Sequence, residues 1–517
     1  MAGLGPPRLA GPGGTRPIYR QAIRIALLLG GVLAAGVIAE HHTAFVPLRF
    51  AVQRDPELMP STRLAPSREV ARGVPLVSLY VSRHDLHDRK TGILANKLKH
   101  GVEWERPGTV SYFENGRLRF SAGVGVRVHG GGARITIPEP GFRLFFRRKY
   151  GAESIPAGVI FDAPHDHPLN RLVLHNDVRV DPQEKIRWHL TNPLAYDIAR
   201  AIGCITPATR PARVLLNGEF LGVYVLTENF HERHYFATHW GYPVRLDAAE
   251  MNALWQQVRA LRPPRVHNVA PLLDLENMTR WFISVLFCAS NDPFQGPGQF
   301  RDPTRGEAQW FWVNWDMDWS FRNWQQETFQ GVTERIGERR RGRRASEPRA
   351  YLFTRLLAED PEYREMFKRI WVDAMNYRLT PAFLRERVDH YRTVTSQYGV
   401  TDLEYLPRID RFFEHRPARI RVLAEQWLNT PPSAKVRLSP SSGPVMMDGH
   451  EIQGPFDGYY FPDMRIRLDI PAAERARFAH WRVNGTRLAD GPTLVLDTDR
   501  DLEIEPVWKD SQERRAG

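Results

Sequence analysis

Apolar residues are spaced as in β-strands over the first folded part of the chain. A short, mostly apolar run from residue 76 to 81 predicts a buried strand. Asn-Gly pairs at 115–116 and 217–218 each separate two strand-like runs, and Asn-Gly is the strongest short sequence signature of a β-hairpin. Further strands are expected at 142–146 and 171–174. This part of the chain therefore predicts a β structure with two hairpins.

The middle of the chain changes to a helical period. We expect a helix over residues 188–202, a buried helix over 272–290, and several helices between 351 and 427. Asp-Pro at 360–361 and Thr-Pro at 380–381 are typical of an N-cap followed by proline in the first helical turn.

A Pro/Ser-rich linker at 428–433 precedes a second β region. Between residues 464 and 470 apolar and charged residues alternate strictly, as in a strand with one buried face. We therefore expect a small all-β domain over residues 435–509, with Trp481 in its core.

The N-terminus has the pattern of a targeting segment. Several arginines in the basic region 1–24 precede an apolar run at 25–39, which ends at charged residue Glu40. This order is typical of a signal peptide or a short signal anchor. The sequence leaves cleavage and anchoring open. Residues 40–74 read as a polar linker, and positive charge held inside predicts that everything after residue 40 is outside the cytoplasm.

Composition narrows the class of protein. The 517 residues include 14 Trp, 26 Phe and 16 Tyr, so the chain can bury several cores and is not intrinsically disordered. The net charge of +12 permits anionic partners, but no zinc-finger, basic-zipper or ribonucleoprotein motif is present, and we expect no nucleic-acid partner. The chain has only two cysteines, Cys204 and Cys288, which excludes a fold stabilised by many disulfides. They could form one disulfide or be two buried thiols.

The stretch 311–321 carries the clearest candidate chemistry. Asp316 and Asp318 stand at i and i+2 after an apolar run, and on a strand they would point the same way. Two carboxylates in that arrangement suit Mg²⁺ or Mn²⁺, with a solvent-facing turn as the alternative. Asp292 precedes the pair and on its own reads as a turn residue. Together the three match the order of the catalytic and metal-binding aspartates of kinases.

These and other motifs resemble the CotH family, named for a spore-coat protein and regarded as divergent secreted protein kinases. The matching stretches follow one another over most of the region 75–430. They are residues 75–79, 84–88, 91–93, 127–131, 149–151, 216–224, 227–228 and 315–321. In addition, residues 478–485 resemble the Phe-x-x-Trp-x-x-Asn-Gly core of small bacterial extracellular β-repeats.

The family resemblance implies an α+β fold: a two-lobed, protein-kinase-like domain over residues 75–430 with a nucleotide between its lobes. By position, Asp292 would be the catalytic aspartate, and Asp316 and Asp318 would bind the metal. The residues implied to contact the nucleotide are Arg127, His129, Gly130, Gly131 and Glu228.

The implied function is that of an extracytoplasmic, membrane-tethered or secreted kinase. It would transfer phosphate from ATP to the hydroxyl of a protein substrate in the cell envelope, with Mg²⁺ or Mn²⁺. The alternative is a catalytically silent, kinase-like binding or envelope-assembly protein, with nucleotidyl transfer as a third possibility. Pro140, where family members commonly have a lysine, favours the silent protein, whereas the Asp316/Asp318 pair favours the enzyme. Arg134, Arg143 and Lys149 are candidates to supply the missing charge.

Overall fold

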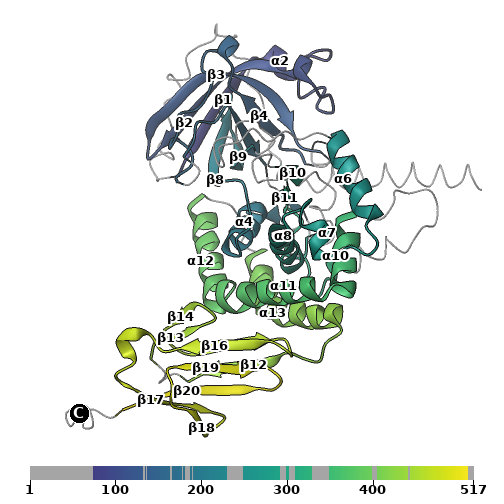
Figure 1. The fold of residues 1–517 in the computed structure, drawn as a ribbon. Coiled ribbons are helices and arrows are strands. Elements are labelled where there is room, and N and C mark those ends of the chain that lie inside the picture. Colours follow the sequence, from purple (N-terminus) through teal and green to yellow (C-terminus); the bar gives the residue numbers. More distant parts are fainter. Residues whose placement is uncertain are drawn as a thin grey trace, which may run out of the picture. The chain divides into compact units, whose positions relative to one another are not determined.

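The protein has an α+β fold, seen here in a computed structural model (Figure 1). The structure describes residues 74–131, 134, 137–163, 166–176, 179–180, 187–188, 190–229, 248–290, 299–301, 309–328, 348–398, 405–439 and 443–509. The expected targeting segment at 25–39 lies outside these residues. Within the described ranges no helix is long and apolar enough to cross a membrane.

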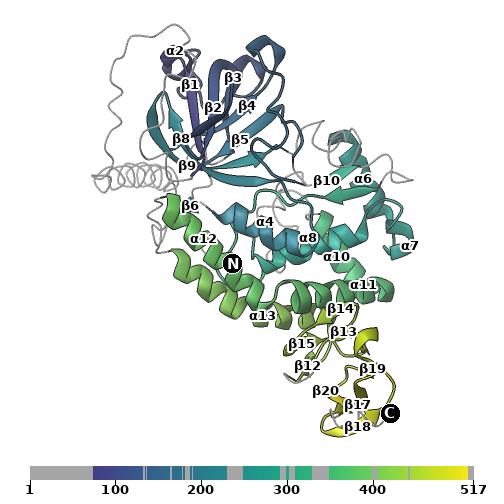
Figure 2. The same ribbon diagram turned by 90° about the vertical axis from the view of Figure 1, so that its left-hand side faces the viewer.

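Seven strands form a closed barrel in the order β1-β2-β3-β4-β5-β9-β8 (Figure 2). Strand β8 runs parallel to β1 and closes the barrel, and the other neighbouring strands are antiparallel. The strands are β1 (Leu76–Val81), β2 (Arg106–Glu114), β3 (Arg117–His129), β4 (Gly141–Phe145), β5 (Arg171–His175), β8 (Thr209–Leu216) and β9 (Glu219–Glu228). All the strands expected in this region are confirmed.

Both predicted Asn-Gly hairpins are present. The first joins β2 to β3 and the second joins β8 to β9. Asn115 and Gly116 have φ angles of 50° and 73°, and Asn217 and Gly218 have 52° and 87°. Two consecutive positive φ angles match the twist of a two-residue hairpin, which explains why Asn and Gly occupy these positions.

Alternation along the barrel strands separates the core from an outer face. Val124, Val126 and Val128 of β3 are buried in the barrel core. Successive side chains of a strand point to opposite faces, so Arg127 and His129 lie on the outer face of the barrel. The polar side chains expected at the site are therefore on the opposite face of the strand from the hydrophobic core.

Short elements border the barrel, and a helical region with its own core follows it. The predicted helix at 188–202 begins only at Thr191, because residues 187–188 pair with 179–180 as strands. The bordering elements are α2 (Arg83–His87), η3 (Val102–Trp104), η4 (Arg148–Tyr150), β6 (Arg179–Val180) and β7 (Arg187–Trp188). The helices are α4 (Thr191–Ala201), α6 (Ala248–Ala260), α7 (Val266–Val269), α8 (Leu275–Phe287), α10 (Pro348–Glu359), α11 (Pro361–Val372), the π-helical turn η6 (Asp373–Arg378), α12 (Pro381–Tyr398) and α13 (Leu406–Leu428).

Local sequence explains where these helices begin and what they bury. Asp360 caps α11 through Oδ1, which accepts hydrogen bonds from the backbone N–H groups of Glu362 at 2.8 Å and Tyr363 at 3.2 Å. This confirms the predicted cap. Helix α8 is buried along most of its length, as expected for the apolar stretch around 272–290. Cys288, at its C-terminal end, and Cys204 are both buried free thiols.

The C-terminal region is all β, and its strands form a hydrophobic core that Val372 at the end of α11 also joins. One sheet has the order β15-β12-β20-β17-β18 and the other β14-β13-β16-β19. Trp481 is fully buried there and donates its Nε1–H to the carbonyl of Gly491 at 3.0 Å. The strands are β12 (Ala434–Leu438), β13 (Val445–Met447), β14 (His450–Ile452), β15 (Phe456–Tyr460), β16 (Arg465–Asp469), β17 (Phe478–Val483), β18 (Thr486–Ala489), β19 (Thr493–Asp497) and β20 (Leu502–Trp508), with η8 (Ala472–Glu474) between β16 and β17.

Candidate functional site

Basic side chains form a row on the outer face of the barrel. Arg127 of β3 and Arg143 of β4 are register partners on neighbouring strands. The Arg143 Nη2 lies 3.1 Å from Nδ1 of His129. The rings of His129 and His175 are arranged edge to face, with their centroids 5.6 Å apart. Strand pairing thus brings together residues from β3, β4 and β5 that are far apart in the sequence.

The row leads to the Asp316/Asp318 segment. Burial lowers the pKa of His175, while the negative charge of Asp318 partly opposes this change. Asp318 therefore lies close enough to His175 to act on its charge. His175 thus links the row that holds His129 and Arg143 to Asp318. Asp292 lies outside the described residues.

The local geometry of the aspartate pair differs from the expectation. Strand β11 (Trp310–Trp312), which pairs with β10 (Gln299–Arg301), ends before the pair, and Asp316 has a φ angle of 60°. The prediction that both carboxylates share one strand face through i, i+2 spacing is therefore wrong, because a left-handed residue breaks the period of two. Aspartate tolerates this conformation better than most residues do.

Backbone hydrogen bonds to other elements hold the aspartate segment. The N–H of Asn314 donates to the carbonyl of Ile205 at 2.8 Å, and the N–H of Met317 donates to Oδ1 of Asn192 at 2.8 Å. Asn192 belongs to α4 and is buried. Hydrogen bonds to α4 and to the residues that follow α4 therefore hold the aspartate segment in place.

The oxygen atoms of this segment suit a hard cation. The described residues contain no group of three or more His, Cys, Asp or Glu that could bind a metal by itself. Mg²⁺, however, usually takes one or two carboxylates and completes its shell with water and substrate phosphates. Flanking the pair in sequence, the buried Oδ1 of Asn314 and Oγ of Ser320 have no hydrogen-bond partner in the structure. Asp316 and Asp318 therefore fit the one or two carboxylates that Mg²⁺ or Mn²⁺ takes when other ligands complete its shell.

The glycine turn follows β3. Gly130 has a φ angle of 109°, which favours glycine, whereas a Cβ added at Gly131 would meet nothing within 4 Å. Arg134 ties the turn down, because its Nη2 donates to the carbonyl of Val128 at 2.7 Å and its Nη1 to that of Lys97 at 3.0 Å. The turn thus has open space at Gly131, and its position is fixed by the hydrogen bonds of Arg134.

Glu228 lies away from this row. It pairs with Leu172 of β5, a residue of the barrel core, so its side chain is on the inner face of the sheet. Its Oε1 lies 2.6 Å from Nε2 of His167, and its Oε2 accepts from the N–H of Ala208 at 3.0 Å. With 1% of the residue exposed, Glu228 joins the segment that carries His167 to the start of β8.

Glu105, which sequence reasoning missed, anchors the basic residues. Its side chain is 0% exposed and lies 2.7 Å from Arg127, 3.1 Å from Arg147 and 3.4 Å from Lys149. The Tyr150 hydroxyl donates to it at 3.0 Å. Burial raises the pKa of Glu105, but the hydrogen bond from Arg127 and the charge of Arg147 outweigh burial, and the pKa falls below its ordinary value. Lys149, a candidate for the missing lysine charge, belongs to this network.

A cavity of about 230 Å³ opens beside this network on the outer face of the barrel. Apolar and neutral residues such as Trp104 and Phe145 make up part of its lining, and none of the described residues that line it is a carboxylate. Its basic lining residues are Lys99, His100, Arg127, Arg134 and Arg143. Even with the single charge of Glu105 counted, positive charge predominates, so the cavity favours an anion.

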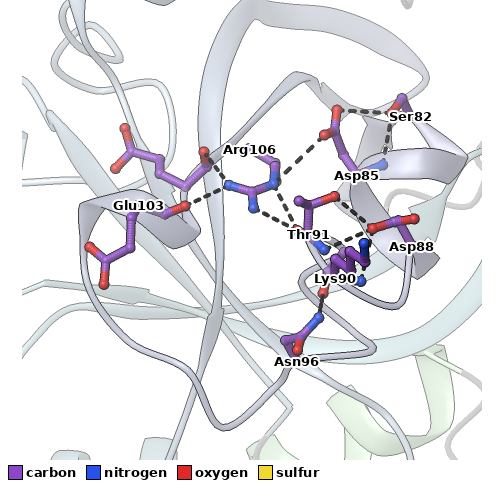
Figure 3. A network of polar contacts seen from close by, with 10 residues as sticks. Ser82, Asp85, Asp88, Lys90, Thr91, Asn96, Glu103 and Arg106 are labelled. Carbon is purple, nitrogen blue, oxygen red and sulfur yellow. Dashed lines mark hydrogen bonds and ion pairs between the residues drawn. The ribbon is translucent and has the colours of Figure 1, made fainter.

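The loop that forms one wall of this cavity is held by a polar network (Figure 3). Oδ1 of Asp88 accepts from the N–H of Thr91 at 2.8 Å, and Arg106 donates to the carbonyl of Thr91 at 2.9 Å and 2.6 Å. Asp85 lies 3.7 Å from Arg106. A Cβ at Gly92 would come within 2.5 Å of the Asp88 backbone nitrogen, so only glycine fits. The sequence motif at 84–93 is therefore a structural support for the cavity.

The CotH kinase protein family matches the chain over residues 126–259 and 245–420. The matched region includes the glycine turn, the outer-face row from β3 to β5, and the Asp316/Asp318 segment. The loop at 84–106 and the C-terminal β region fall outside it. No curated protein matches the chain.

Proposed function

Because the chain belongs to the CotH kinase family, we propose that it is a kinase that transfers the terminal phosphoryl group of ATP to a protein hydroxyl. In this proposal the barrel and the helical region are the two lobes of a kinase-like fold. The observation that carries the proposal is the basic cavity on the barrel together with the row of side chains that leads from it to Asp318. It supports a site for a polyphosphate next to a metal-binding carboxylate pair.

Arg127 and Arg143 supply the fixed positive charge in this proposal. The carbonyl of Pro140 accepts a hydrogen bond from the Tyr224 hydroxyl at 2.9 Å, and a proline offers no charge where family members commonly have lysine. Arg127 is held by buried Glu105, which resembles in kind the lysine–glutamate pair of kinases. A preorganised cation can stabilise charge that develops on a transferring phosphoryl group without first moving.

The aspartates complete the proposed site. Asp316 and Asp318 would hold Mg²⁺ or Mn²⁺, which when bound neutralises phosphate charge. Asp292 would accept the hydrogen bond of the acceptor hydroxyl and orient it. A catalytically silent binding protein is the second candidate, and the absence of a lysine at Pro140 is the observation that favours it.

The full-length protein incubated with γ-labelled ATP and Mg²⁺ or Mn²⁺ tests the proposal. We expect metal-dependent labelling of the protein itself or of an added acceptor protein. Arg143→Met should reduce the labelling, whereas Arg148→Met, which removes an arginine that is 88% exposed and paired with Glu153, should not. ATP binding without labelling under all conditions would favour the silent protein. If the protein shows no ATP binding and no labelling, the kinase proposal is refuted.

The location belongs to the same proposal. The basic and apolar N-terminal pattern supports a chain whose residues after 40 are outside the cytoplasm, either anchored or released. A reporter enzyme that works only outside the cytoplasm, fused after the last residue, should be active. Activity of a matched reporter that works only in the cytoplasm would contradict this location.

A further inference from the structure

A second cavity, of about 640 Å³, lies far along the chain from the basic one. It is lined by α11, η6, α12 and α13 together with residues at 433, 457 and 459 of the C-terminal region. Most of its lining is apolar and includes Trp371, Leu384, Val388 and Phe413. Its volume falls in the range of about 300–1,000 Å³ that is usual for pockets that bind small molecules.

The walls of this cavity are held in place by contacts between the helical and β regions. The Asn376 side chain donates to the carbonyl of Tyr459 at 3.0 Å and accepts from its N–H at 3.0 Å. The guanidinium of Arg421 stacks 3.6 Å above the ring of Tyr459. All three residues line the cavity, so it is formed before any ligand arrives.

Helix α13 adds a backbone acceptor to an otherwise apolar wall. Pro417 lies inside this helix and has no N–H, so the carbonyl of Phe413 one turn earlier lacks its usual helical donor. Both residues line the cavity. The π-helical turn η6 also lines the cavity, and π-helical turns are frequent at functional sites.

Carboxylates and arginines both line the rim of the cavity. Asp410 lies 3.0 Å from Arg392 and Asp457 lies 2.8 Å from Lys435, so each of these carboxylates has a cation beside it. The third lining carboxylate, Glu414, is 72% exposed to water, which screens its charge. In contrast, no carboxylate of the described ranges forms an ion pair with the exposed Arg385. Positive charge is therefore available at the mouth of an apolar cavity.

We propose that this cavity binds a single-chain lipid anion, with its hydrocarbon chain against Trp371, Val388 and Phe413 and its carboxylate at Arg385. An apolar chain replaces water from the lining, and a guanidinium can bind a carboxylate through two hydrogen bonds. The site is separate from the proposed nucleotide site, and the inference does not depend on kinase activity.

Tryptophan quenching in the full-length protein tests this site. 9,10-Dibromostearate, used below its aggregation concentration, should quench part of the fluorescence, and the quenching should be lost in Trp371→Phe. A dibrominated long-chain ammonium should bind at least about tenfold more weakly, as expected when one charge-assisted hydrogen-bonded pair is missing. Butyrate should not compete with the dibromostearate, because it lacks the chain.

Two variants and a matched control locate the head and the chain. Arg385→Gln should weaken dibromostearate binding about tenfold or more. Ala418→Phe places a ring at an exposed lining position of α13 and should block entry without disturbing the core. As the control for Arg385 of α12, Arg411→Gln removes an exposed arginine of α13 that does not line the cavity, and it should leave binding unchanged. Absence of quenching in the wild type, equal binding of the ammonium, or full binding by both Arg385→Gln and Ala418→Phe would overturn the proposal.

Discussion

Replacing Glu105 by glutamine tests whether the basic outer face of the barrel is organised by one buried charge. The substitution keeps the shape of the side chain but removes its charge and one acceptor oxygen. Arg127 would then face an amide instead of the carboxylate that it contacts at 2.7 Å and 3.1 Å. The variant should still fold, because the barrel core lies on the other face of the strands.

The expected destabilisation follows from the exposure of the partners. Breaking a fully buried ion pair costs about 3–5 kcal/mol. Here the glutamate side chain is 0% exposed, but Arg127 is 22%, Arg147 40% and Lys149 54% exposed, so water partly compensates the cations. We therefore expect Glu105→Gln to lower the free energy of unfolding of the barrel by about 2–3 kcal/mol at neutral pH.

Urea unfolding read by hydrogen–deuterium exchange in β2 and β3 measures this change in the barrel itself. In the folded protein the pKa of Glu105 lies below its ordinary value of 4.5. The charge of Glu105 therefore makes its full contribution to the free energy of unfolding above about pH 4.5, and this contribution is lost as the pH falls through the lowered pKa. The difference between wild type and variant should thus be constant near neutral pH and shrink below about pH 4.5.

Glu103→Gln is the matched control, because Glu103 is an exposed glutamate two residues away. Its effect should stay within about 0.5 kcal/mol. An equally small effect of Glu105→Gln, or a difference from wild type that does not change with pH, would refute the reasoning that a buried charge holds these cations.

Three other predictions test separate parts of the fold. Asp360→Ala removes the cap of α11 and the acceptor of the Val266 N–H at 2.6 Å, and should destabilise the helical region by about 2–3 kcal/mol in urea. Trp481→Ala should destabilise the C-terminal β region by about 3–5 kcal/mol and raise exchange in β17 and β20, and an equal rise in the barrel would contradict separate cores. Burial raises the pKa of Cys204 to about 12 and that of Cys288 further, so Ellman's reagent near pH 8 should label them only after unfolding.

Features set by short stretches of chain could be predicted from the sequence. The two Asn-Gly hairpins and the Asp-Pro cap of α11 depend on the backbone preferences of neighbouring residues. The alternation around Val126 likewise placed Arg127 on the opposite face from the core. These signals need no knowledge of distant contacts.

Features set by distant contacts could not be predicted in the same way. Closure of the barrel depends on β8 meeting β1, and Glu105 meets Arg127 and Tyr150 from positions 22 and 45 residues away. Asp316 is left-handed, and the next residue, Met317, is hydrogen-bonded to Asn192 of α4, so spacing alone gave the wrong geometry there. The sequence also could not predict that Glu228 lies on the inner face of the sheet, because this depends on its pairing with Leu172 of β5.

Hydrogen–deuterium exchange of the full-length protein with and without ATP and Mn²⁺ tests the central claim most directly. The proposal places the nucleotide against the outer face of the barrel and next to the Asp316/Asp318 pair. We therefore predict slower exchange in β3, β4 and residues 309–328 only when ATP and Mn²⁺ are present together, and loss of this protection in Arg143→Met. Unchanged exchange in all three segments at saturating ATP and Mn²⁺, or protection confined to the C-terminal β region, would contradict the account.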